Sequence, residues 1–382
     1  MEWKEDVLGN VLEVKYGKDH KKLADGQYPV YGSGGLMRYV DSKLYDGPSI
    51  LIPRKGTLNN IMFVESPFWT VDTMFWSIIN TDKVDPKFLF YSICKRDFAS
   101  MNVGSAVPSM TVNILNDIQI SYPKNIEDQR RIVSILSSLD RKIELNNKIN
   151  ADLEEMAQAI FKNWFVDFEP FKDGKFVDSE LGMIPEGWKV GRADDFYQIN
   201  IGKTPPRKEH KCFSTNPADK IWVSIANMGN SGIFISDSSE YLTKEAVDRH
   251  NIIMVPRNTI LLSFKLTVGR VAIADKELTT NEAIARFILS DDKYMEYLYL
   301  YLKNFDYNSL GSTSSIATAV NSKTIKGMQM LQPSDKIIDA FHIQVNPIFE
   351  KIRSLTKENS RLSLLRDTLL PRLMSGELEI PE

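Results

Sequence analysis

The stretch IVSILSSLDRKIELNNKINADLEEMAQAI, residues 132–160, decides the fold that this sequence predicts. Its apolar residues alternate in steps of four and three, as they do along the seam of a coiled coil. A second stretch, FHIQVNPIFEKIRSLTKENSRLSLLRDTL at residues 341–369, shows the same alternation. The positions expected to pair these helices are Ile132, Leu136, Leu139, Ile143, Asn146, Asn150, Leu153, Ile160, Phe341, Val345, Ile348, Ile352, Leu355, Asn359, Leu362 and Leu369.

Asparagine stands in both seams at equivalent positions, Asn150 and Asn359. A polar seam residue weakens the apolar core but fixes register and partner choice. A helix packed only on its own domain would also carry an apolar stripe, which is the alternative interpretation. Two seams with matching asparagines favour a helix pair. Pro371 is expected to interrupt the second helix near its end.

The chain also repeats itself. Residues 50–63, ILIPRKGTLNNIMF, align without a gap on residues 260–273, ILLSFKLTVGRVAI. Near the start, Trp3 aligns with Trp188 and Gly17 with Gly202, at a smaller offset. The second copy must therefore carry about 25 additional residues between Lys203 and Ile260. We infer that the chain is a tandem repeat of one structural unit.

Each copy is expected to contain short β-strands followed by one long helix. Four segments rich in Ile, Leu, Val and Phe predict strands: Ser49–Pro53, Asn60–Glu65, Thr259–Phe264 and Arg270–Asp275. Short helices are expected at Pro86–Arg96 and Met295–Lys303, and the glycine-rich segment Tyr31–Gly35 is expected to be a loop.

The predicted fold class is therefore α+β, with two β-rich globular domains separated by two long helices. The helices are expected to form an antiparallel coiled coil, which gives the repeat a pseudo-twofold axis. The expected boundaries are residues 1–124 for the first domain, 125–170 for the central helix, 171–333 for a linker and the second domain, and 334–382 for the C-terminal helix and tail.

Composition describes an ordinary soluble protein, with 43% hydrophobic and 25% charged residues among 382. The charged start lacks the apolar core of a signal peptide, and no apolar run approaches the roughly 18 residues of a membrane helix. We expect a cytoplasmic protein without a membrane partner. The net charge of −3 weighs against nucleic-acid binding, so any DNA contact must come from local basic clusters.

At this point the residues resemble a known family. The segments LDRKIELNN from Leu139, AQAIF from Ala157, WFVDFEP from Trp164 and RDTLLPRLMSGEL from Arg366 are similar to the helices of specificity subunits of type I restriction–modification systems. The resemblance implies two recognition domains, each reading one half of a split double-stranded DNA site. It also implies docking of two methyltransferase subunits, through which restriction subunits join. Those partners would use S-adenosylmethionine, ATP and Mg, whereas this chain would need no cofactor.

Polar clusters recur in corresponding parts of the two copies and suit DNA. Lysines and an arginine that could neutralise phosphates are Lys18, Lys21, Lys22, Lys203, Arg207, Lys208 and Lys211. Groups that could read base edges are Arg54, Lys55, Thr57, Asn59, Asn60, Lys265, Thr267 and Arg270. A solvated charged loop is the alternative for any one residue, but recurrence in both copies favours a functional interpretation for the clusters.

Catalytic motifs are incomplete. Gly202-Lys203-Thr204 would need a glycine five residues earlier to resemble a phosphate-binding loop, and Tyr197 stands there. The histidines show no metal-ligand spacing beyond a weak His210-x-Cys212 pair, so no metal site is expected. The sequence therefore predicts a non-catalytic subunit. The alternatives are a coiled-coil adaptor without DNA affinity and a fused methyltransferase or nuclease.

A group of aromatic residues follows the first long helix: Trp164, Phe165, Phe168 and Phe171. It could form a local core under the helix end. If exposed, it would instead offer an apolar patch to a partner.

Overall fold

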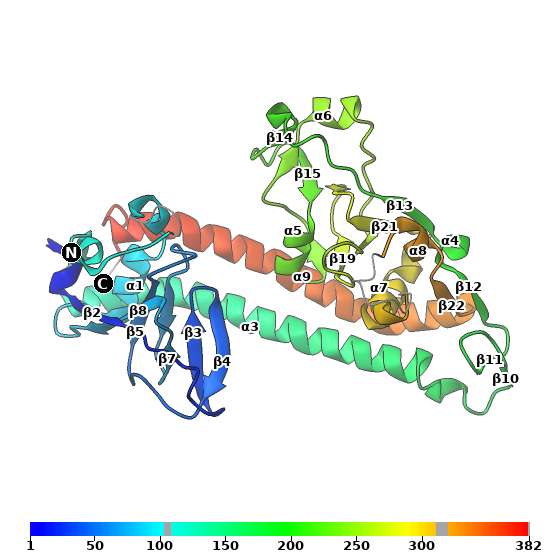
Figure 1. Ribbon diagram of the computed structural model, residues 1–382, viewed down its shortest axis with the longest axis horizontal. Coiled ribbons are helices and arrows are strands. Elements are labelled where there is room, and N and C mark those ends of the chain that lie inside the picture. Colours follow the sequence, from blue (N-terminus) through cyan, green and yellow to red (C-terminus); the bar gives the residue numbers. More distant parts are fainter. Residues whose placement is uncertain (103–107, 311–319, 381–382) are drawn as a thin grey trace. The chain divides into compact units, whose positions relative to one another are not determined.

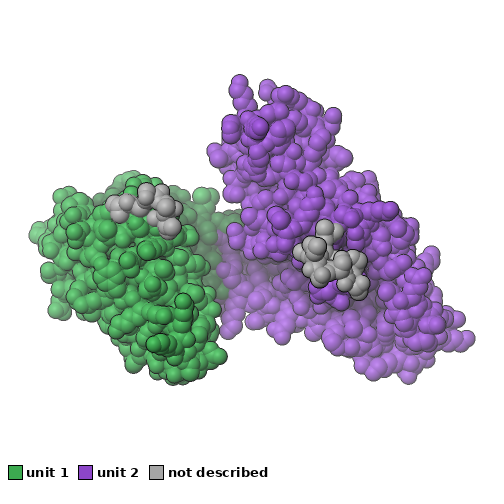
Figure 2. All heavy atoms as spheres, viewed as in Figure 1, with its two compact units in different colours: residues 1–144, 360–382 green, residues 145–359 purple. Residues whose placement is uncertain are grey.

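The computed structural model describes residues 1–102, 108–310 and 320–380, which Figure 1 shows as a ribbon. The chain divides into two compact units, coloured separately in Figure 2. Unit 1 contains Met1–Glu144 and Ser360–Glu382, and unit 2 contains Leu145–Asn359. Both long helices, α3 (Ile126–Phe165) and α9 (Asp335–Met374), pass from one unit to the other. Each unit thus holds one β-rich domain together with part of each helix, so the α+β class is as predicted.

The domain of unit 1 begins and ends in one small antiparallel sheet of β1 (Trp3–Val7) and β9 (Gln119–Pro123). Between these strands lie a four-stranded sheet, β2-β8-β5-β6, and a three-stranded sheet, β4-β3-β7. Their bounds are β2 Leu12–Tyr16, β3 Tyr28–Gly32, β4 Gly35–Val40, β5 Ser49–Pro53, β6 Met62–Val64, β7 Trp69–Thr70 and β8 Met74–Ile79. The helices of this domain are η1 Leu8–Asn10, α1 Pro86–Ile93, η2 Phe98–Met101 and α2 Val112–Asn116.

The core of unit 1 joins its domain to the helices. Every residue of β5 is buried because β5 lies between β8 and β6 and faces α1. Ile52 and Phe88 belong to the same apolar cluster as Leu136 of α3 and Leu373 of α9. Burying each such side chain contributes roughly 1.5–3 kcal/mol, so the helix ends are part of the fold of this unit.

Unit 2 has the same plan with more elements. Its domain is closed by β12 (Lys189–Arg192) paired with β22 (Gln329–Gln332), and contains the sheets β13-β21-β18-β19-β16 and β14-β17-β15-β20. The strand bounds are β13 Gln198–Ile201, β14 Phe213–Ser214, β15 Lys220–Val223, β16 Phe234–Ile235, β17 Tyr241–Leu242, β18 Ile260–Ser263, β19 Val271–Ala274, β20 Thr279–Thr280 and β21 Ile284–Ile288. The helices are α4 Ala193–Phe196, η4 His210–Cys212, α5 Ile225–Asn230, α6 Lys244–Arg249, η5 Asp292–Tyr294, α7 Met295–Asn304, η6 Tyr307–Leu310 and α8 Ser322–Lys326. Before this domain lie η3 Glu169–Phe171 and the pair β10 Phe176–Val177 and β11 Ile184–Pro185.

The predicted repeat is confirmed by matching strand pairs. In unit 1, β3 pairs in parallel with β7 so that Tyr31 faces Thr70. In unit 2, β15 pairs in parallel with β20 so that Val223 faces Thr280. Tyr31 and Val223 are thus equivalent, which places the additional residues of the second copy on both sides of β15. Helix α6 lies within the longer part.

The two long helices are antiparallel within each unit, as predicted. In unit 1, Asp140 of α3 accepts a hydrogen bond at 2.8 Å from Arg366 of α9. In unit 2, Asn146 donates to the side-chain oxygen of Asn359 at 2.9 Å, and Phe161 packs against Phe341. Residue numbers on α9 fall as those on α3 rise, which is the antiparallel order.

The predicted seam is only partly buried. Its buried members are Ile132, Leu136, Asn146, Phe341, Val345, Ile352 and Leu355, whereas Leu139, Ile143, Asn150, Leu153, Ile160, Ile348, Asn359, Leu362 and Leu369 are half-buried. Phe161 and Phe349 are buried in place of their neighbours Ile160 and Ile348. The reason is that α3 and α9 pack on the domain of unit 2 as well as on each other, so the buried face turns away from a strict seam.

One local expectation holds in part and another is wrong. The loop expected at Tyr31–Gly35 is shorter than predicted: only Ser33 and Gly34 form the turn, and Gly32 pairs with Gly35 to close a tight hairpin between β3 and β4. Helix α9 continues through Pro371 to Met374. The apolar contacts of Leu370 and Leu373 in the core of unit 1 offset the hydrogen bond that the proline cannot donate.

The aromatic group after the first helix forms a local core rather than an exposed patch. Phe165 is 5% exposed, and its ring centroid lies 4.8 Å from those of Tyr297 and Phe341. Phe168 and Phe171 both pack on Trp188.

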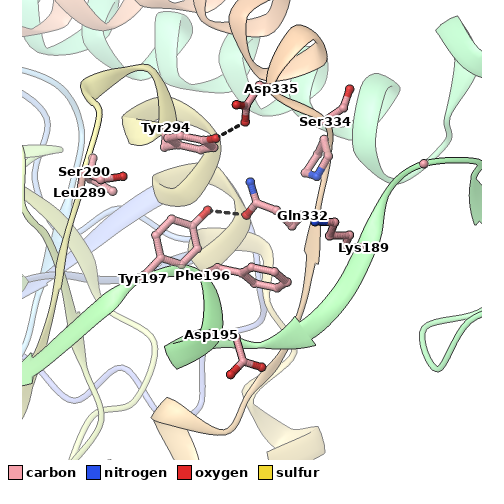
Figure 3. Close-up of a pocket in the computed structure, with 12 residues that line it drawn as sticks. Lys189, Asp195, Phe196, Tyr197, Leu289, Ser290, Tyr294, Gln332, Ser334 and Asp335 are labelled. Atoms are coloured by element: carbon pink, nitrogen blue, oxygen red, sulfur yellow. Dashed lines mark hydrogen bonds between the residues drawn. The ribbon is translucent and has the colours of Figure 1, made fainter.

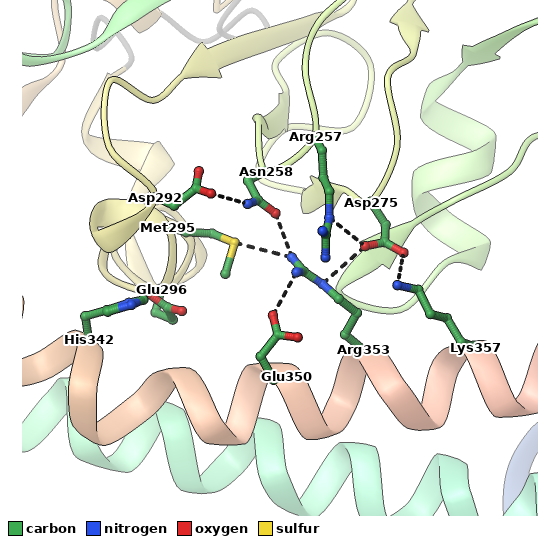
Figure 4. Close-up of polar contacts among 10 residues, drawn as sticks. All are labelled: Arg257, Asn258, Asp275, Asp292, Met295, Glu296, His342, Glu350, Arg353 and Lys357. Atoms are coloured by element: carbon green, nitrogen blue, oxygen red, sulfur yellow. Dashed lines mark hydrogen bonds and ion pairs between the residues drawn. The ribbon is translucent and has the colours of Figure 1, made fainter.

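A buried ionic network ties the domain of unit 2 to α9 (Figure 4). The guanidinium of Arg353 on α9 forms an ion pair with Asp275 at 3.2 Å and donates to Asn258 at 2.7 Å. Lys357, one turn on, also pairs with Asp275 at 3.2 Å. The side chains of Arg353 and Asp275 are 5% and 3% exposed. Because each buried charge has an opposite charge beside it, the network fixes where the domain sits on this helix.

Candidate nucleic-acid interface

Two loops of unit 1 carry candidate DNA-binding residues, and both are anchored to one short backbone segment, residues 70–73. The loop after β2 is anchored where the N–H of Lys18 donates to the carbonyl of Thr70 at 2.9 Å. The loop after β5 is anchored where the N–H groups of Arg54 and Lys55 donate to the carbonyl of Thr73, at 2.8 and 3.2 Å. The structure therefore places these two loops, far apart in the sequence, next to each other.

Unit 2 repeats this arrangement. The N–H of Lys203 donates to the carbonyl of Thr280 at 2.9 Å, and that of Phe264 donates to the carbonyl of Ala283 at 3.0 Å. Indole N–H groups also bind equivalent carbonyls in the two units: Trp69 donates to Lys18, and Trp222 donates to Lys203.

Glycine is required at the start of each anchored loop. A Cβ on Gly17 would lie 2.0 Å from the carbonyl oxygen of Val71, and one on Gly202 would lie 1.9 Å from that of Asn281. Neither backbone can retreat without losing the hydrogen bond next to it, so no side chain fits. The recurrent Gly-Lys pair is thus a packing requirement that also presents a lysine.

Most candidate lysines point to solvent. Lys18, Lys21, Lys22, Lys55, Lys203, Lys208, Lys211 and Lys265 are exposed, although Nζ of Lys203 donates to the backbone carbonyl of His250 at 2.5 Å. Within residues 1–102, 108–310 and 320–380, none of these eight forms an ion pair with a carboxylate. Asp19 offsets part of their charge, because the hydrogen bond from the backbone N–H of Lys21 holds its pKa below the usual range. These lysines remain available to phosphates.

The side chains of the candidate arginines already bind partners within the protein. Arg207 pairs with Glu240 at 2.6 Å and stacks on Trp222, whose ring centroid lies 4.6 Å from its guanidinium carbon. Arg270 donates to the carbonyl of Ile225 at 2.7 Å. Arg54 donates to the carbonyl of Asp72 at 3.2 Å. In this conformation the three arginines shape the loops, and a base contact would require them to leave these partners.

The two candidate asparagines also hold the fold. Asn59 donates to Asp97 at 3.2 Å and accepts from the N–H of Ala99 at 2.9 Å. Asn60 donates to the carbonyl of Ser33 at 2.8 Å, which ties the loop to the β3–β4 hairpin. Thr57 and Thr267 are exposed at the tips of their loops.

Leu266, which was not among the site residues predicted from the sequence, is the most exposed apolar residue among the described residues of unit 2. Its side chain is 100% exposed, and its φ of +61° is a conformation that favours glycine. A non-glycine residue there costs roughly 1–2 kcal/mol. In unit 1, apolar side chains of β4 are exposed as well, namely Leu36, Met37 and Tyr39. Nothing in the sequence indicated this conformation, because leucine rarely adopts a positive φ.

One carboxylate lies among the cations of unit 2. Glu282 accepts a hydrogen bond from Thr204 in the loop after β13. Burial alone would raise the pKa of Glu282, but this hydrogen bond and the charges of Lys265 and Arg207 lower it below the usual range. Glu282 therefore stays ionised and joins the two loops electrostatically.

A pocket of unit 2 is lined by polar side chains that hydrogen-bond to one another (Figure 3). Tyr197 donates to Gln332 at 3.1 Å, and Tyr294 hydrogen-bonds Asp335 at the start of α9. Burial, and then the Asp335 hydrogen bond, raise the pKa of Tyr294. Because these groups bind one another, they join the domain to the helix.

The sequence model that matches this chain is described as the type I restriction modification DNA specificity domain, and it matches residues 1–155 and again residues 185–342. The two matches fall on the two copies of the repeat. The chain belongs to this family of type I DNA specificity subunits.

Relatives of this specificity subunit span nearly its full length. A type I restriction enzyme specificity subunit of Methanocaldococcus jannaschii, MjaIX, is 29% identical over 95% of this chain and 86% of its own. The HindI specificity subunit of Haemophilus influenzae is 28% identical over 83% of both chains. The crystal structure of an S subunit from M. genitalium, 14% identical, superposes with a TM-score of 0.59 over 98% of this chain and 96% of its own, and so has the same fold. No helix in the described ranges is long and apolar enough to cross a membrane.

Proposed function

We propose that this specificity subunit reads a split double-stranded DNA site, with one recognition domain for each half. The observation that carries the proposal is the repeated arrangement of two loops on one segment, which presents exposed lysines in both units. Such lysines would bind phosphates and fix the register, while the loop tips would reach base edges in a groove.

The chain would act without chemistry of its own. We assign methyl transfer to two methyltransferase subunits that use S-adenosylmethionine, and ATP- and Mg-dependent cleavage to restriction subunits that join through them. A fused methyltransferase or nuclease is disfavoured because the catalytic motifs in the sequence are incomplete. An adaptor without DNA affinity would not need matched lysine loops in both copies.

Each domain is built as an exchangeable module. The first and last strands of the second domain, β12 and β22, pair along their whole length, with Lys189 facing Gln332. Its two chain ends therefore lie side by side, as the ends of a domain that can be replaced should. We expect that exchanging residues 189–332 for those of a relative will change one half of the methylated site and leave the other unchanged.

Methylation mapping of the complex with its methyltransferase tests that exchange. The matched control exchanges residues 3–123, bounded by the equivalent pair β1 and β9, and should change only the opposite half. Alteration of both halves by either exchange would contradict one reader for each half-site. Absence of any sequence preference in the parent complex would favour the adaptor.

Exposed apolar side chains on the long helices are the proposed docking points for methyltransferase. Leu364 and Leu365 of α9 are 70% and 47% exposed. Replacing Leu364 by aspartate should leave the free energy of unfolding within about 0.5 kcal/mol, because the site is at the surface. Affinity for the methyltransferase should fall about tenfold or more, the value of one buried leucine. Titration calorimetry measures this, with Leu364→Met as the control that keeps the apolar surface; equal affinities would move the docking site elsewhere.

Leu266 is proposed to contact a groove of DNA. Asparagine tolerates its positive φ, so Leu266→Asn should keep the free energy of unfolding or raise it by up to about 1 kcal/mol. DNA affinity should fall about tenfold through the lost apolar contact. Urea unfolding and fluorescence anisotropy on the mapped site separate the two effects. Leu266→Met should bind like the parent, and an Asn variant that also did so would exclude the contact.

A further inference from the structure

Three side chains with metal-binding donors meet in unit 2, between Lys203 and Ile260, where the second copy of the repeat is longer. Cys212 ends η4, Glu209 precedes that helix, and His250 caps the end of α6. Their ligand atoms all lie within 4.8 Å of one another. The sequence did not indicate this group, because 38 residues separate Cys212 from His250 and only the fold brings them together.

The distances among the three donor atoms fit the edges of a zinc tetrahedron. Sγ of Cys212 lies 3.7 Å from Nε2 of His250 and 3.5 Å from Oε2 of Glu209, and Nε2 lies 3.3 Å from Oε2. With Zn–S near 2.3 Å and Zn–N or Zn–O near 2.1 Å, tetrahedral edges are about 3.6 Å from sulfur and about 3.4 Å between nitrogen and oxygen. As a hydrogen bond, 3.3 Å between His250 and Glu209 is long, since such bonds centre near 2.9 Å.

The surroundings suit a bound cation. Cys212 is 5% exposed, and the side chains of His250 and Glu209 are 17% and 33% exposed. The thiolate and the carboxylate together would balance a divalent charge. Arg249 pairs with the same Oε2 of Glu209 at 3.2 Å, so a bound ion would share this oxygen with the guanidinium or displace it. A cleft lined by Lys208 and Glu245 opens beside Cys212 and leaves room for water.

We propose that Glu209, Cys212 and His250 bind one zinc ion, with water as the fourth ligand. A thiolate with an imidazole selects zinc over magnesium or calcium, which prefer oxygen. The ion would join η4 to the end of α6. This part of the fold has a small apolar cluster of its own, in which Trp222, Leu242, Val247 and Ile252 are buried.

The ion would also position two of the candidate DNA contacts. Lys208 precedes Glu209, and Lys211 lies between His210 and Cys212, so both lysines are fixed when the ligands are fixed. This consequence rests on the function proposed above, whereas zinc binding does not depend on it.

Metal analysis and cobalt spectroscopy of the full chain test the site. The purified chain should carry one zinc ion, and replacement by Co²⁺ should give the intense thiolate-to-cobalt absorption together with the visible bands of tetrahedral cobalt. Cys212→Ser should abolish the thiolate band and weaken zinc binding at least about 100-fold, since even partners of ligands contribute 10–100-fold. Cys94→Ser, the matched control at the other cysteine, should retain both.

A parent chain that is folded by circular dichroism but binds neither Zn²⁺ nor Co²⁺ overturns the proposal, as does a thiolate band that survives in Cys212→Ser or disappears in Cys94→Ser. Should Cys212→Ser fail to fold, His250→Gln provides the second test, with zinc affinity reduced by a similar factor. These measurements contain no DNA, so their failure would leave the proposed function untouched, and failure of DNA binding would leave the zinc site untouched.

Discussion

Replacing Ile352 by aspartate is expected to unfold unit 2 or to lower its free energy of unfolding by more than about 4 kcal/mol. Ile352 is 2% exposed and belongs to the core cluster that α9 shares with the domain and α3. Removing a buried isoleucine beyond Cβ costs roughly 2–5 kcal/mol, and burying a carboxylate adds to that. Urea unfolding followed by circular dichroism measures the effect.

The same helix provides the matched control. Ile343 lies nine residues earlier in α9 and is 75% exposed. Ile343→Asp makes the identical chemical change in the identical helix, and it should alter stability by no more than about 0.5 kcal/mol. If both variants unfolded at the same urea concentration as the parent, the packing of α9 on its domain would be wrong.

The sequence predicted the two long helices well because the apolar spacing that indicates them is repeated many times along each helix. Leu136 and Val345 are buried as the alternating pattern requires. The pattern could not predict that Phe161 and Phe349 would be buried in place of Ile160 and Ile348. It carries no information on the domain of unit 2, against which both helices also pack. Helix α9 turns its buried face toward the domain of unit 2, and only the folded chain shows this.

The polar positions of the seam illustrate a second limit. Repeat symmetry relates Asn359 to Asn150, yet Asn359 bonds Asn146 and Asn147. In an antiparallel pair, symmetry-related residues lie opposite each other only at the axis itself. Asn150 differs from Asn359, because its buried Oδ1 has no partner among the described residues. One of the two symmetry-related positions is thus satisfied and the other is not, which pairwise sequence comparison cannot reveal.

The sequence predicted which loops carry the candidate DNA-binding residues. It did not predict the contacts that the side chains of these residues make in the folded chain. The anchoring glycines recur in sequence, so the loops could be found. Whether an arginine is free depends on what folds beside it, and Arg207 meets Glu240 and Trp222 only in the folded domain. The lysines stay exposed because a long flexible side chain with a hydrated charge gains little from burial.

The second large effect is expected on the spacing of the DNA site. Both connections between the units are helical, so under the proposed function α3 and α9 would set the separation of the half-sites. Inserting one heptad after Glu144 and one after Asn359, where the compact units divide, adds about 10 Å to each helix. The preferred gap should lengthen by about three base pairs, which methylome sequencing detects. A heptad inserted into α3 alone shifts the register against α9 and should abolish assembly.

The inserted residues also rotate the helices, and the added base pairs rotate the DNA, so the test makes a further prediction. Seven residues advance an α-helix by nearly two whole turns, with a shortfall of only about 20°. Three base pairs, however, turn one DNA half-site by about 100° relative to the other, since about 10.5 base pairs make a turn. The single-heptad variant should therefore recognise the longer gap with reduced affinity. Three heptads add about 32 Å to each helix, which is close to the length of one turn of DNA. They rotate each α-helix by about 60° less than six whole turns. That variant should bind more tightly than the single-heptad one, at a gap about nine base pairs longer than the parent's. A gap that stayed at its original length in both variants would show that the helices do not set the spacing.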